Sequence, residues 1–234
     1  GTLMLEGQPA VNERIIAGNH GDRYSEAGRR FNFVSFYFET KTDAAGKFSF
    51  QKVPPGRCNL FRQPLRSHTG FESHETSVVL NAGGVTQVTL GGTGRPVVGK
   101  AVLVGDGGLV DWQSVPVLLR SKAAPDSPRP RRADFPSAQE YVAAAEKFFE
   151  AARSQRRFGA FCERNGSFRL PDIPAGVYEL EIQVRDATAD SVGSEEHFGS
   201  VKRDVIVPES SEGRAHEPVE VGTLELARVT GAAK

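Results

Sequence analysis

The chain has 234 residues, of which 38% are hydrophobic and 25% are charged, as is usual for a folded globular protein. Its 29 basic and 29 acidic residues cancel, so no overall field attracts nucleic acid or an anionic membrane, and we expect no nucleic-acid partner. No apolar run approaches the roughly 20 residues that span a bilayer, which argues against direct membrane insertion. The 14 prolines and 25 glycines favour a turn-rich β protein.

The first predicted strands lie at residues 3–11 and in the aromatic run at residues 31–40. Side chains alternate along a strand, so this run has two ring-bearing faces. One face carries Phe31, Phe33 and Tyr37, and the other carries Val34, Phe36 and Phe38. Only one of them can line a core, and we expect a second domain or a helix to cover the other. The alternative is that Phe31, Phe33 and Tyr37 stack on a sugar or a peptide as ligand-binding residues.

A repeated motif follows: GKFSFQKVPPGRCNL at residues 46–60 returns as GSFRLPDIPAGVYEL at residues 166–180, an offset of 120 residues. Each copy predicts a half-buried strand, a turn built from Pro and Gly, and a return strand. The repeat preserves apolar spacing and turn chemistry, and no nucleophile, metal ligand or acid–base pair repeats with it. The positions that we take to define the fold are Gly46, Phe48, Pro54, Gly56, Gly166, Phe168, Pro174, Gly176 and Tyr178.

The repeat predicts a mainly β protein made of two tandem antiparallel β-sandwiches. Strand patterns at residues 76–92 close the first copy, and strand content stops and restarts at Gly91–Gly94. We therefore place the first sandwich at residues 1–92, the second at residues 93–229, and a tail at residues 230–234. Four residues make a short hinge, so we expect the two sandwiches to touch.

An insertion at residues 123–157 interrupts the strand pattern of the second copy. Prolines at positions 125, 128, 130 and 136 exclude a regular helix or a central strand, so an extended surface loop is expected. Ser137 and Glu140 then match a capping box, and apolar residues recur at helical spacing. One helix is therefore predicted over residues 138–156, inserted between strands.

The side chains of this insertion allow two interpretations. We expect Tyr141, Phe148 and Phe149 to pack the helix against a sheet face or the domain junction, whereas the alternative is a helix that docks a partner. Basic residues beside the helix, including Arg131 and Arg132, either form a solvated face or contact an acidic partner. Arg131, Arg132, Tyr141 and Phe148 are accordingly candidate partner-binding residues.

The reactive residue types form no recognisable active site. The five histidines contain no HExxH or HxH pair, and no cysteine lies at metal-ligand spacing from them, so we expect no metal and no cofactor. The sequence has no GxSxG motif, and neither cysteine has a neighbouring histidine that would mark a nucleophile. Cys58 occupies the position of Tyr178 in the other copy, which favours a buried core residue, whereas whether Cys58 and Cys162 are free stays open.

The paired motif resembles the carboxypeptidase regulatory-like domain. The resemblance rests on TDAAGKFSFxxVPPG in the first copy and NGSFRLxxIPAGxYEL in the second, and it covers most of both halves. It implies a transthyretin-like (prealbumin-like) seven-stranded β-sandwich without catalytic residues, as found in tandem in large bacterial cell-envelope proteins. A related group of surface sandwiches forms Lys-to-Asn isopeptide bonds, but the closing strand at residues 218–228 contains no Asn, so no such bond is expected.

The sequence is compatible with three classes of function. The favoured hypothesis is a noncatalytic structural or interaction region of a larger extracytoplasmic bacterial protein, periplasmic or on the cell surface, whose signal or anchor is absent from this sequence. Its partners would be domains of the same parent chain or another envelope protein. The alternative is a carbohydrate- or peptide-binding module that uses the exposed rings of the first sandwich. A third class is an enzyme on a transthyretin-like scaffold, a small amidohydrolase or an iron dioxygenase.

Overall fold

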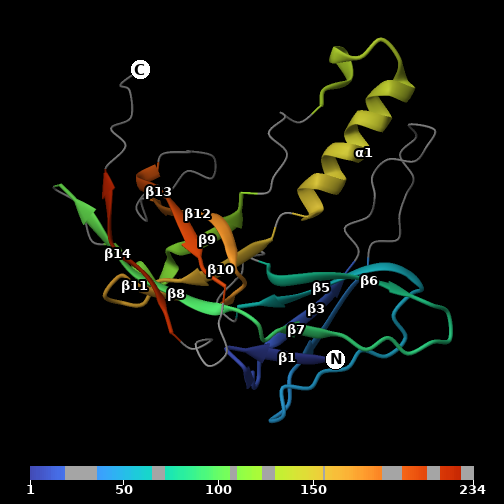
Figure 1. Ribbon diagram of the computed structural model, residues 1–234, viewed down its shortest axis with the longest axis horizontal. Helices are drawn as coiled ribbons and strands as arrows, with labels where there is room; N and C mark the ends of the chain where they lie inside the picture. The colour runs from blue at the N-terminus through green and yellow to red at the C-terminus, as the bar shows by residue number, and fades with distance from the viewer. Residues whose placement is uncertain are drawn as a thin grey trace.

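The computed structural model describes residues 1–18, 36–64, 72–105, 110–122, 130–154, 156–185, 197–209 and 217–227. Within these residues the chain is mainly β with one α-helix, so the mainly β prediction is confirmed (Figure 1). The described strands before residue 92 form sheets only with one another, and so do those after residue 94. We refer to these two groups of strands as the N-terminal part and the C-terminal part.

The N-terminal part contains two sheets. Three strands are ordered β2-β1-β7 and four are ordered β4-β3-β5-β6. Their bounds are β1 (Thr2–Leu5), β2 (Gln8–Pro9), β3 (Arg14–Gly18), β4 (Tyr37–Lys41), β5 (Gly56–Gln63), β6 (Ser73–Leu80) and β7 (Thr89–Gly91). One hydrophobic cluster joins the sheets, because Leu3 and Leu90 from the first sheet pack with Ile15 and Leu60 from the second. The two sheets therefore lie face to face around a common core.

The C-terminal part has a single seven-stranded sheet in the order β10-β9-β12-β13-β14-β8-β11. Its strands are β8 (Arg95–Val104), β9 (Pro116–Ser121), β10 (Arg157–Phe161), β11 (Ser167–Ile173), β12 (Gly176–Arg185), β13 (His197–Val207) and β14 (Val219–Ala227). Strands β13 and β14 are joined by the single pair Ser200↔Ala227, so the sheet bends there into two layers. Residues of both layers share one core cluster, including Leu119 and Leu180 from one layer and Leu170 and Leu226 from the other.

Strand pairing repeats between the two parts. In each part the first strand pairs in parallel with the last, β1 with β7 and β8 with β14. The order β4-β3-β5-β6 corresponds in the same way to β10-β9-β12-β13. The repeated motif differs in one respect, since its strand is β11 in the C-terminal part but only the bridge Thr2↔Lys47 in the N-terminal part. The short strand β2 pairs with Met4 and Leu5, which leaves only the start of β1 for the motif.

The turn of the repeated motif has the same backbone contacts in both copies. Gly46 and Gly166 take positive φ angles of 70° and 80°, a conformation that L-residues with side chains seldom adopt. The carbonyl of each accepts a hydrogen bond from the opening strand, from Leu3 N at 2.9 Å and from Ala101 N at 2.8 Å. These glycines therefore fix the motif to the first strand of each part.

The motif also orders the return strand of the C-terminal part. The Tyr178 hydroxyl donates to the Pro174 carbonyl at 2.8 Å, and its ring lies fully in the core. Cys58, at the same position of the N-terminal copy, is also buried, as predicted. Cys58 and Cys162 are both free thiols, and burial raises the pKa of Cys162 to about 12.

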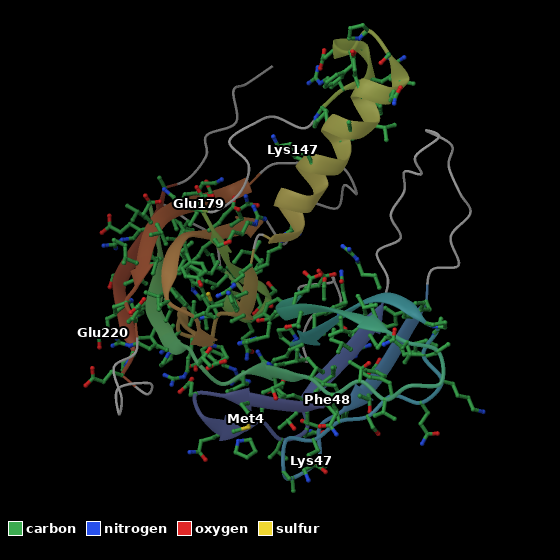
Figure 2. All side chains as sticks on the ribbon, turned by 45° about the vertical axis from the view of Figure 1, so that its right-hand side comes forward. Met4, Lys47, Phe48, Lys147, Glu179 and Glu220 are labelled. Carbon is green, nitrogen blue, oxygen red and sulfur yellow. The ribbon has the colours of Figure 1, made fainter. Side chains whose placement is uncertain are left out.

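Helix α1 (Ala138–Ser154) lies between β9 and β10 and begins where the sequence predicted. Ser137 Oγ accepts a hydrogen bond from Glu140 N at 3.2 Å, as the capping pattern requires. Figures 1 and 2 show the helix, with Lys147 on it, extending away from the strands. On the helix, Val142 and Ala145 are buried, the Tyr141 ring lies 5.9 Å from the Phe135 ring, and the Phe149 side chain lies outside the described residues. Within the described residues, no helix is long and apolar enough to cross a membrane.

The glycine turn gives a direct stability test. A Cβ at Gly166 would overlap the Ala101 carbonyl oxygen, whereas a Cβ at Gly222, where φ is 72°, meets nothing within 4 Å. We expect Gly222→Ala to cost about 1–2 kcal/mol, the strain of a left-handed alanine. Gly166→Ala should cost clearly more, because the β8 contact must also shift. Urea unfolding followed by the fluorescence of Trp112, which packs on the C-terminal core, measures both. Equal losses would contradict this account of the turn.

Candidate functional site at the junction of the two parts

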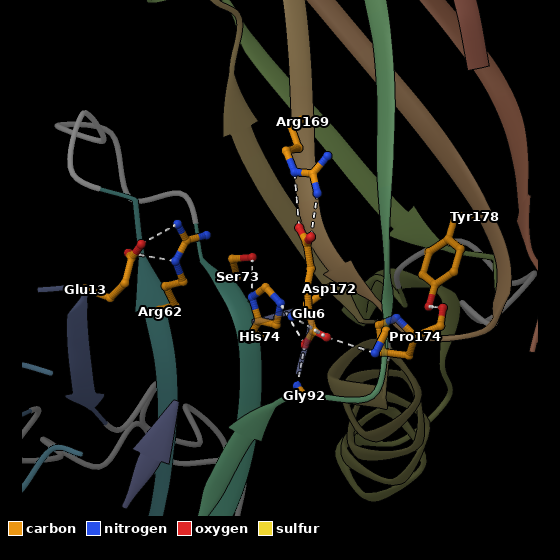
Figure 3. Close-up of polar contacts among 11 residues, drawn as sticks. Glu6, Glu13, Arg62, Ser73, His74, Gly92, Arg169, Asp172, Pro174 and Tyr178 are labelled. Atoms are coloured by element: carbon orange, nitrogen blue, oxygen red, sulfur yellow. Dashed lines mark hydrogen bonds and ion pairs between the residues drawn. The ribbon is translucent and has the colours of Figure 1, made fainter. Parts of the chain in front are cut away.

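The carboxylate of Asp172, at the end of β11, connects the C-terminal part to the N-terminal part. Its Oδ1 accepts hydrogen bonds from Glu6 N at 3.2 Å and Gly94 N at 2.9 Å, and its Oδ2 accepts from Gly92 N at 2.6 Å (Figure 3). Asp172 is fully buried. Hydrogen bonds from backbone amides to a buried carboxylate are among the stronger ones in proteins. One side chain therefore holds a hairpin turn of one part and the connection between the parts.

The repeat explains how the chain presents this carboxylate. Asp172 has a φ of 57°, and Lys52, its counterpart 120 residues earlier, has a φ of 59°. Both copies thus bend at the same left-handed residue just before the Pro-containing turn. In the C-terminal copy the pairing of β11 shifts register between Leu170 and Ile173, which includes this residue. The bend occurs in both copies, but only the second places an acid there and buries it.

The connection between the parts is shaped around Asp172. Gly91 and Gly92 have φ angles of 67° and 95°, and a Cβ on Gly91 would lie 2.5 Å from Asp172 Oδ2. A Cβ on Gly94 would overlap the backbone of Asp172 and Ile173. Glycine is required here because backbone must approach a buried carboxylate closely. The short connection that the sequence predicted is thus packed against the C-terminal part.

An ion pair lies at the rim of the junction. Arg169 Nε donates to Glu6 Oε1 at 3.2 Å, and the Arg169 side chain is 49% exposed. Exposed pairs of this kind contribute about 0–1 kcal/mol. The rim pair therefore adds orientation to a contact whose stability comes from the buried amides.

His74, at the start of β6, brings the N-terminal part against the same carboxylate. Its Nε2 lies 3.7 Å from Asp172 Oδ2, beyond hydrogen-bonding distance, and its Nδ1 lies 2.9 Å from Ser73 Oγ. The imidazole meets the Phe158 ring edge to face at 5.2 Å, and Phe158 in turn contacts Tyr178. A continuous row of rings thus runs from β6 into the core of the C-terminal part.

Burial and the nearby Arg62 guanidinium keep the His74 ring neutral. Burial, first, and the guanidinium of Arg62, second, lower the pKa of His74 to about 4, against the opposing attraction of Asp172. Arg62 is itself held by Glu13 through Nε–Oε2 and Nη2–Oε1 hydrogen bonds of 2.8 and 3.1 Å. At neutral pH the junction therefore contains one buried carboxylate and an uncharged imidazole.

Ser73, His74 and Asp172 are the residue types of a hydrolase triad, but their surroundings are not those of a nucleophile. The three residues are 1%, 6% and 0% exposed, so no substrate can reach the Ser73 hydroxyl. Both oxygens of Asp172 already accept amide hydrogen bonds. In the part of the chain that the structure describes, no group of three His, Cys, Asp or Glu side chains is placed to hold a metal ion. The arrangement is suited to fixing two parts of a chain together.

Of the aromatic candidates, Tyr37 lies within the described residues, and Phe31 and Phe33 lie outside them. Tyr37 is 57% exposed, and its hydroxyl donates to Gln63 Oε1 at 3.1 Å. Phe36 and Phe38 pack on the N-terminal core, so the predicted alternation of the strand holds at these residues. Covering of the Tyr37 face by a second domain or a helix was expected, and Tyr37 itself is not covered.

The other candidates lie along the insertion. Arg132 begins the short 3₁₀ helix η2 (Arg132–Asp134), and its Nη1 donates to the Phe135 carbonyl at 2.8 Å. The Phe135 and Tyr141 rings are 5.9 Å apart, so Arg131, Arg132 and Tyr141 gather at the start of α1. Phe148 lies two turns further along the helix and is half-buried. The aromatic strand and the insertion thus supply separate groups of candidates.

Sequence reasoning missed the junction residues. His74 belongs to no histidine motif in the sequence, and Asp172 is one unassigned position within the repeat. The available signal was the contrast between Lys52 and Asp172 at matching positions of otherwise similar motifs. Nothing in the sequence pairs Asp172 with Glu6 or Gly92, since they are 166 and 80 residues away.

These observations define a mainly β protein whose two parts are joined through a buried carboxylate.

No family model matches the chain, and no curated protein matches it. Among solved structures, the minor pilin GBS52 of Streptococcus agalactiae is 14% identical with a TM-score of 0.30, covering 99% of this chain and 91% of that one. BcpA, the major pilin subunit of Bacillus cereus, is 11% identical with a TM-score of 0.30, over 94% and 60%. The Bacillus anthracis TIE protein is 12% identical with a TM-score of 0.25, over 96% and 32%. Scores of this size do not establish a common fold, so function is inferred below from the residues themselves.

Replacing the junction carboxylate tests its structural role. Asp172→Asn keeps the shape but turns one acceptor into a donor facing an amide, so we expect a loss of about 2–4 kcal/mol in the free energy of unfolding. Lys52→Asn at the equivalent exposed bend is the matched control and should change stability by less than about 0.5 kcal/mol. Urea denaturation measures both variants. If Asp172→Asn left the free energy of unfolding unchanged, the amides would have found other partners and the structural role would be contradicted.

The pKa of His74 predicts a pH dependence of stability. The unfolded chain takes up a proton on His74 near pH 6.5, whereas the folded chain does so only near pH 4. Between these values the unfolded state holds more protons, so the free energy of unfolding falls as the pH drops, by on the order of 3 kcal/mol. Above pH 6.5 the residue contributes no pH dependence. His74→Gln, which does not titrate, should have a shallower slope between pH 6.5 and 4 in denaturation series, and an unchanged slope would contradict the assignment.

Proposed function

We propose that this chain is a noncatalytic structural region: two tandem transthyretin-like β-sandwiches of the carboxypeptidase regulatory-like kind, held at a fixed angle. In this role it spaces and docks a neighbouring domain or partner within a larger extracytoplasmic bacterial protein. The observation that carries the proposal is the buried Asp172 carboxylate, which binds amides of the N-terminal part and of the connection. A region that only linked two domains would not need a buried acid and three close-packed glycines between them.

The distribution of polar groups supports this role. The junction buries Asp172 and His74, and the repeated positions Phe48 and Phe168 lie in the two cores. The sequence resemblance to cell-envelope modules supports the extracytoplasmic placement. Fixed geometry between two cores is useful to a spacer, because a rigid arm transmits position whereas a flexible link does not.

One observation favours a second candidate, a carbohydrate- or peptide-binding module. Tyr37 remains 57% exposed on the outer face of β4, with its hydroxyl oriented by Gln63. An exposed, oriented ring is the element that stacks on a sugar or a peptide. Tyr37→Ala would abolish binding on a glycan array and a peptide array if this module operates, and the absence of hits on both arrays would exclude it.

The rigid-spacer proposal is tested by measuring a distance between the two parts. Spin labels on Val85→Cys and Glu220→Cys sit at exposed positions, one in each part, while Cys58 and Cys162 are about 1% exposed and protected from labelling. Double electron–electron resonance should give one narrow distance distribution, which broadens in Asp172→Asn and stays narrow in Lys52→Asn. A broad distribution in the unmodified background would overturn the proposal, because the parts would then move independently.

A further inference from the structure

We propose that the outer face of β9 and β12 binds the carboxylate of a partner peptide that also carries an apolar side chain. The inference deepens the proposed docking role and rests on it, since it names the chemistry of the partner. The face lies in the C-terminal part, on the surface that Glu179 marks in Figure 2. None of its residues belongs to the Asp172 junction.

A hollow of about 270 Å³ lies on this face. Its lining residues are Pro116, Leu118, Arg120, Glu181 and Gln183. They are alternate residues of two neighbouring strands, with Leu118 directly opposite Glu181, and therefore project from the same side of the sheet. The hollow thus has an apolar floor on β9 and a polar wall on β12.

The polar wall is held in place before any ligand arrives. The Glu181 side chain is only 9% exposed, and its Oε1 accepts a hydrogen bond from Gln183 Nε2 at 2.7 Å. Arg120 Nη1 lies 3.2 Å from Glu181 Oε2, and Lys202 Nζ lies 3.5 Å from Oε1. Glu181 is therefore neutralised, and its main effect is to fix the Arg120 guanidinium at the edge of the hollow.

The unbalanced charge lies on the other side of Arg120. Strand pairing places Arg157 of β10 directly opposite Arg120. Arg157 is exposed and has no ion pair among the described residues. Like charges at directly opposite positions destabilise a sheet, and an anion between them would remove that repulsion. Two guanidinium groups in this position present several N–H donors to one carboxylate.

Local charge selects the kind of anion. Glu179 lies opposite Arg120 on the side away from Arg157, and Asp204 lies opposite Glu179 and pairs with Lys122 at 2.6 Å. With Arg157 and Lys202, the surface has four cations and three anions, a single net positive charge. This matches a carboxylate better than a phosphate dianion or a nucleic-acid backbone. Pro116 and Leu118 beside the cations are half-buried and accept an apolar side chain attached to the same ligand.

The N-terminal part lacks the same site. The matching strand pair there sets Ile16 opposite Phe61, and both side chains are buried. Phe61 occupies the position of Glu181 in the repeat, 120 residues earlier. The charged wall is therefore a feature of one copy only, as expected for a surface that acquired its own partner after duplication.

The experiment uses the intact chain and two matched probes, N-acetyl-alanyl-leucine with a free carboxylate and the same dipeptide as its carboxamide. Amide signals of residues 117–120 and 181–183 are followed by two-dimensional NMR during titration. We expect saturable shifts with the acid and about tenfold weaker binding of the carboxamide, the loss of one charge-assisted contact. Arg157→Gln should weaken binding of the acid by about tenfold, and Arg57→Gln, an exposed arginine of the N-terminal part, should leave it unchanged.

Three results would overturn the proposal: no shifts at these residues up to about 20 mM acid, a concentration that detects millimolar binding; equal binding of acid and carboxamide; or equal binding to the Arg157→Gln variant. Tighter binding of inorganic phosphate than of the dipeptide acid at the same residues would also overturn it, because the site would then be a general anion site. The spectrum of Arg157→Gln away from β9, β10 and β12 confirms that the variant is folded. Failure here leaves the label-to-label distance unaffected, so it is distinguishable from failure of the rigid-spacer role.

Discussion

The relative placement of the two parts depends on one buried negative charge. A carboxylate without partners would be expelled from such a site or neutralised, so the amides of Glu6, Gly92 and Gly94 must converge on Asp172 for the structure to form. Because these amides must reach the carboxylate, the connecting residues 91, 92 and 94 are glycine. For the same reason the turn between β1 and β2, which contains Glu6, has to lie against Asp172. The imidazole of His74 then fills the remaining side without adding charge. The Asp172 carboxylate therefore determines the packing of the two parts, the residues of the connection and the charge of the junction.

The two copies of the motif share a backbone turn, and they differ in the side chains at the junction. Both copies of the motif turn through a left-handed residue, but Lys52 faces solvent while Asp172 faces the other part. The two parts also differ on the faces of these strands, where the N-terminal part has Phe61 and the C-terminal part has Glu181 at the matching position. The C-terminal part therefore has a buried carboxylate facing the N-terminal part and a charged outer surface, neither of which the N-terminal part has at the matching positions.

Local features of this fold were readable from the sequence, and long-range ones were not. Alternation in residues 36–38, the capping pair before α1 and the buried Cys58 follow from neighbours within a few residues, so each was predicted and found. Apolar periodicity does not encode which polar atoms meet, so Asp172 was indistinguishable from a solvated loop acid. Helical spacing predicted α1 in the same local way, but it identifies an apolar stripe and not the surface that the stripe meets, so the direction in which α1 extends from the strands was not readable from the sequence.

The parallel pairing of β8 with β14 has a mechanical consequence. The two ends of the C-terminal part leave from adjacent strands that run in the same direction. A pull on the start of β8 and the end of β14 therefore slides one strand along the other, and their hydrogen bonds bear the load together. In an antiparallel pair pulled from one end, the bonds would break one after another like a zipper. A chain organised in this way is loaded in shear, the direction in which a sheet resists extension best.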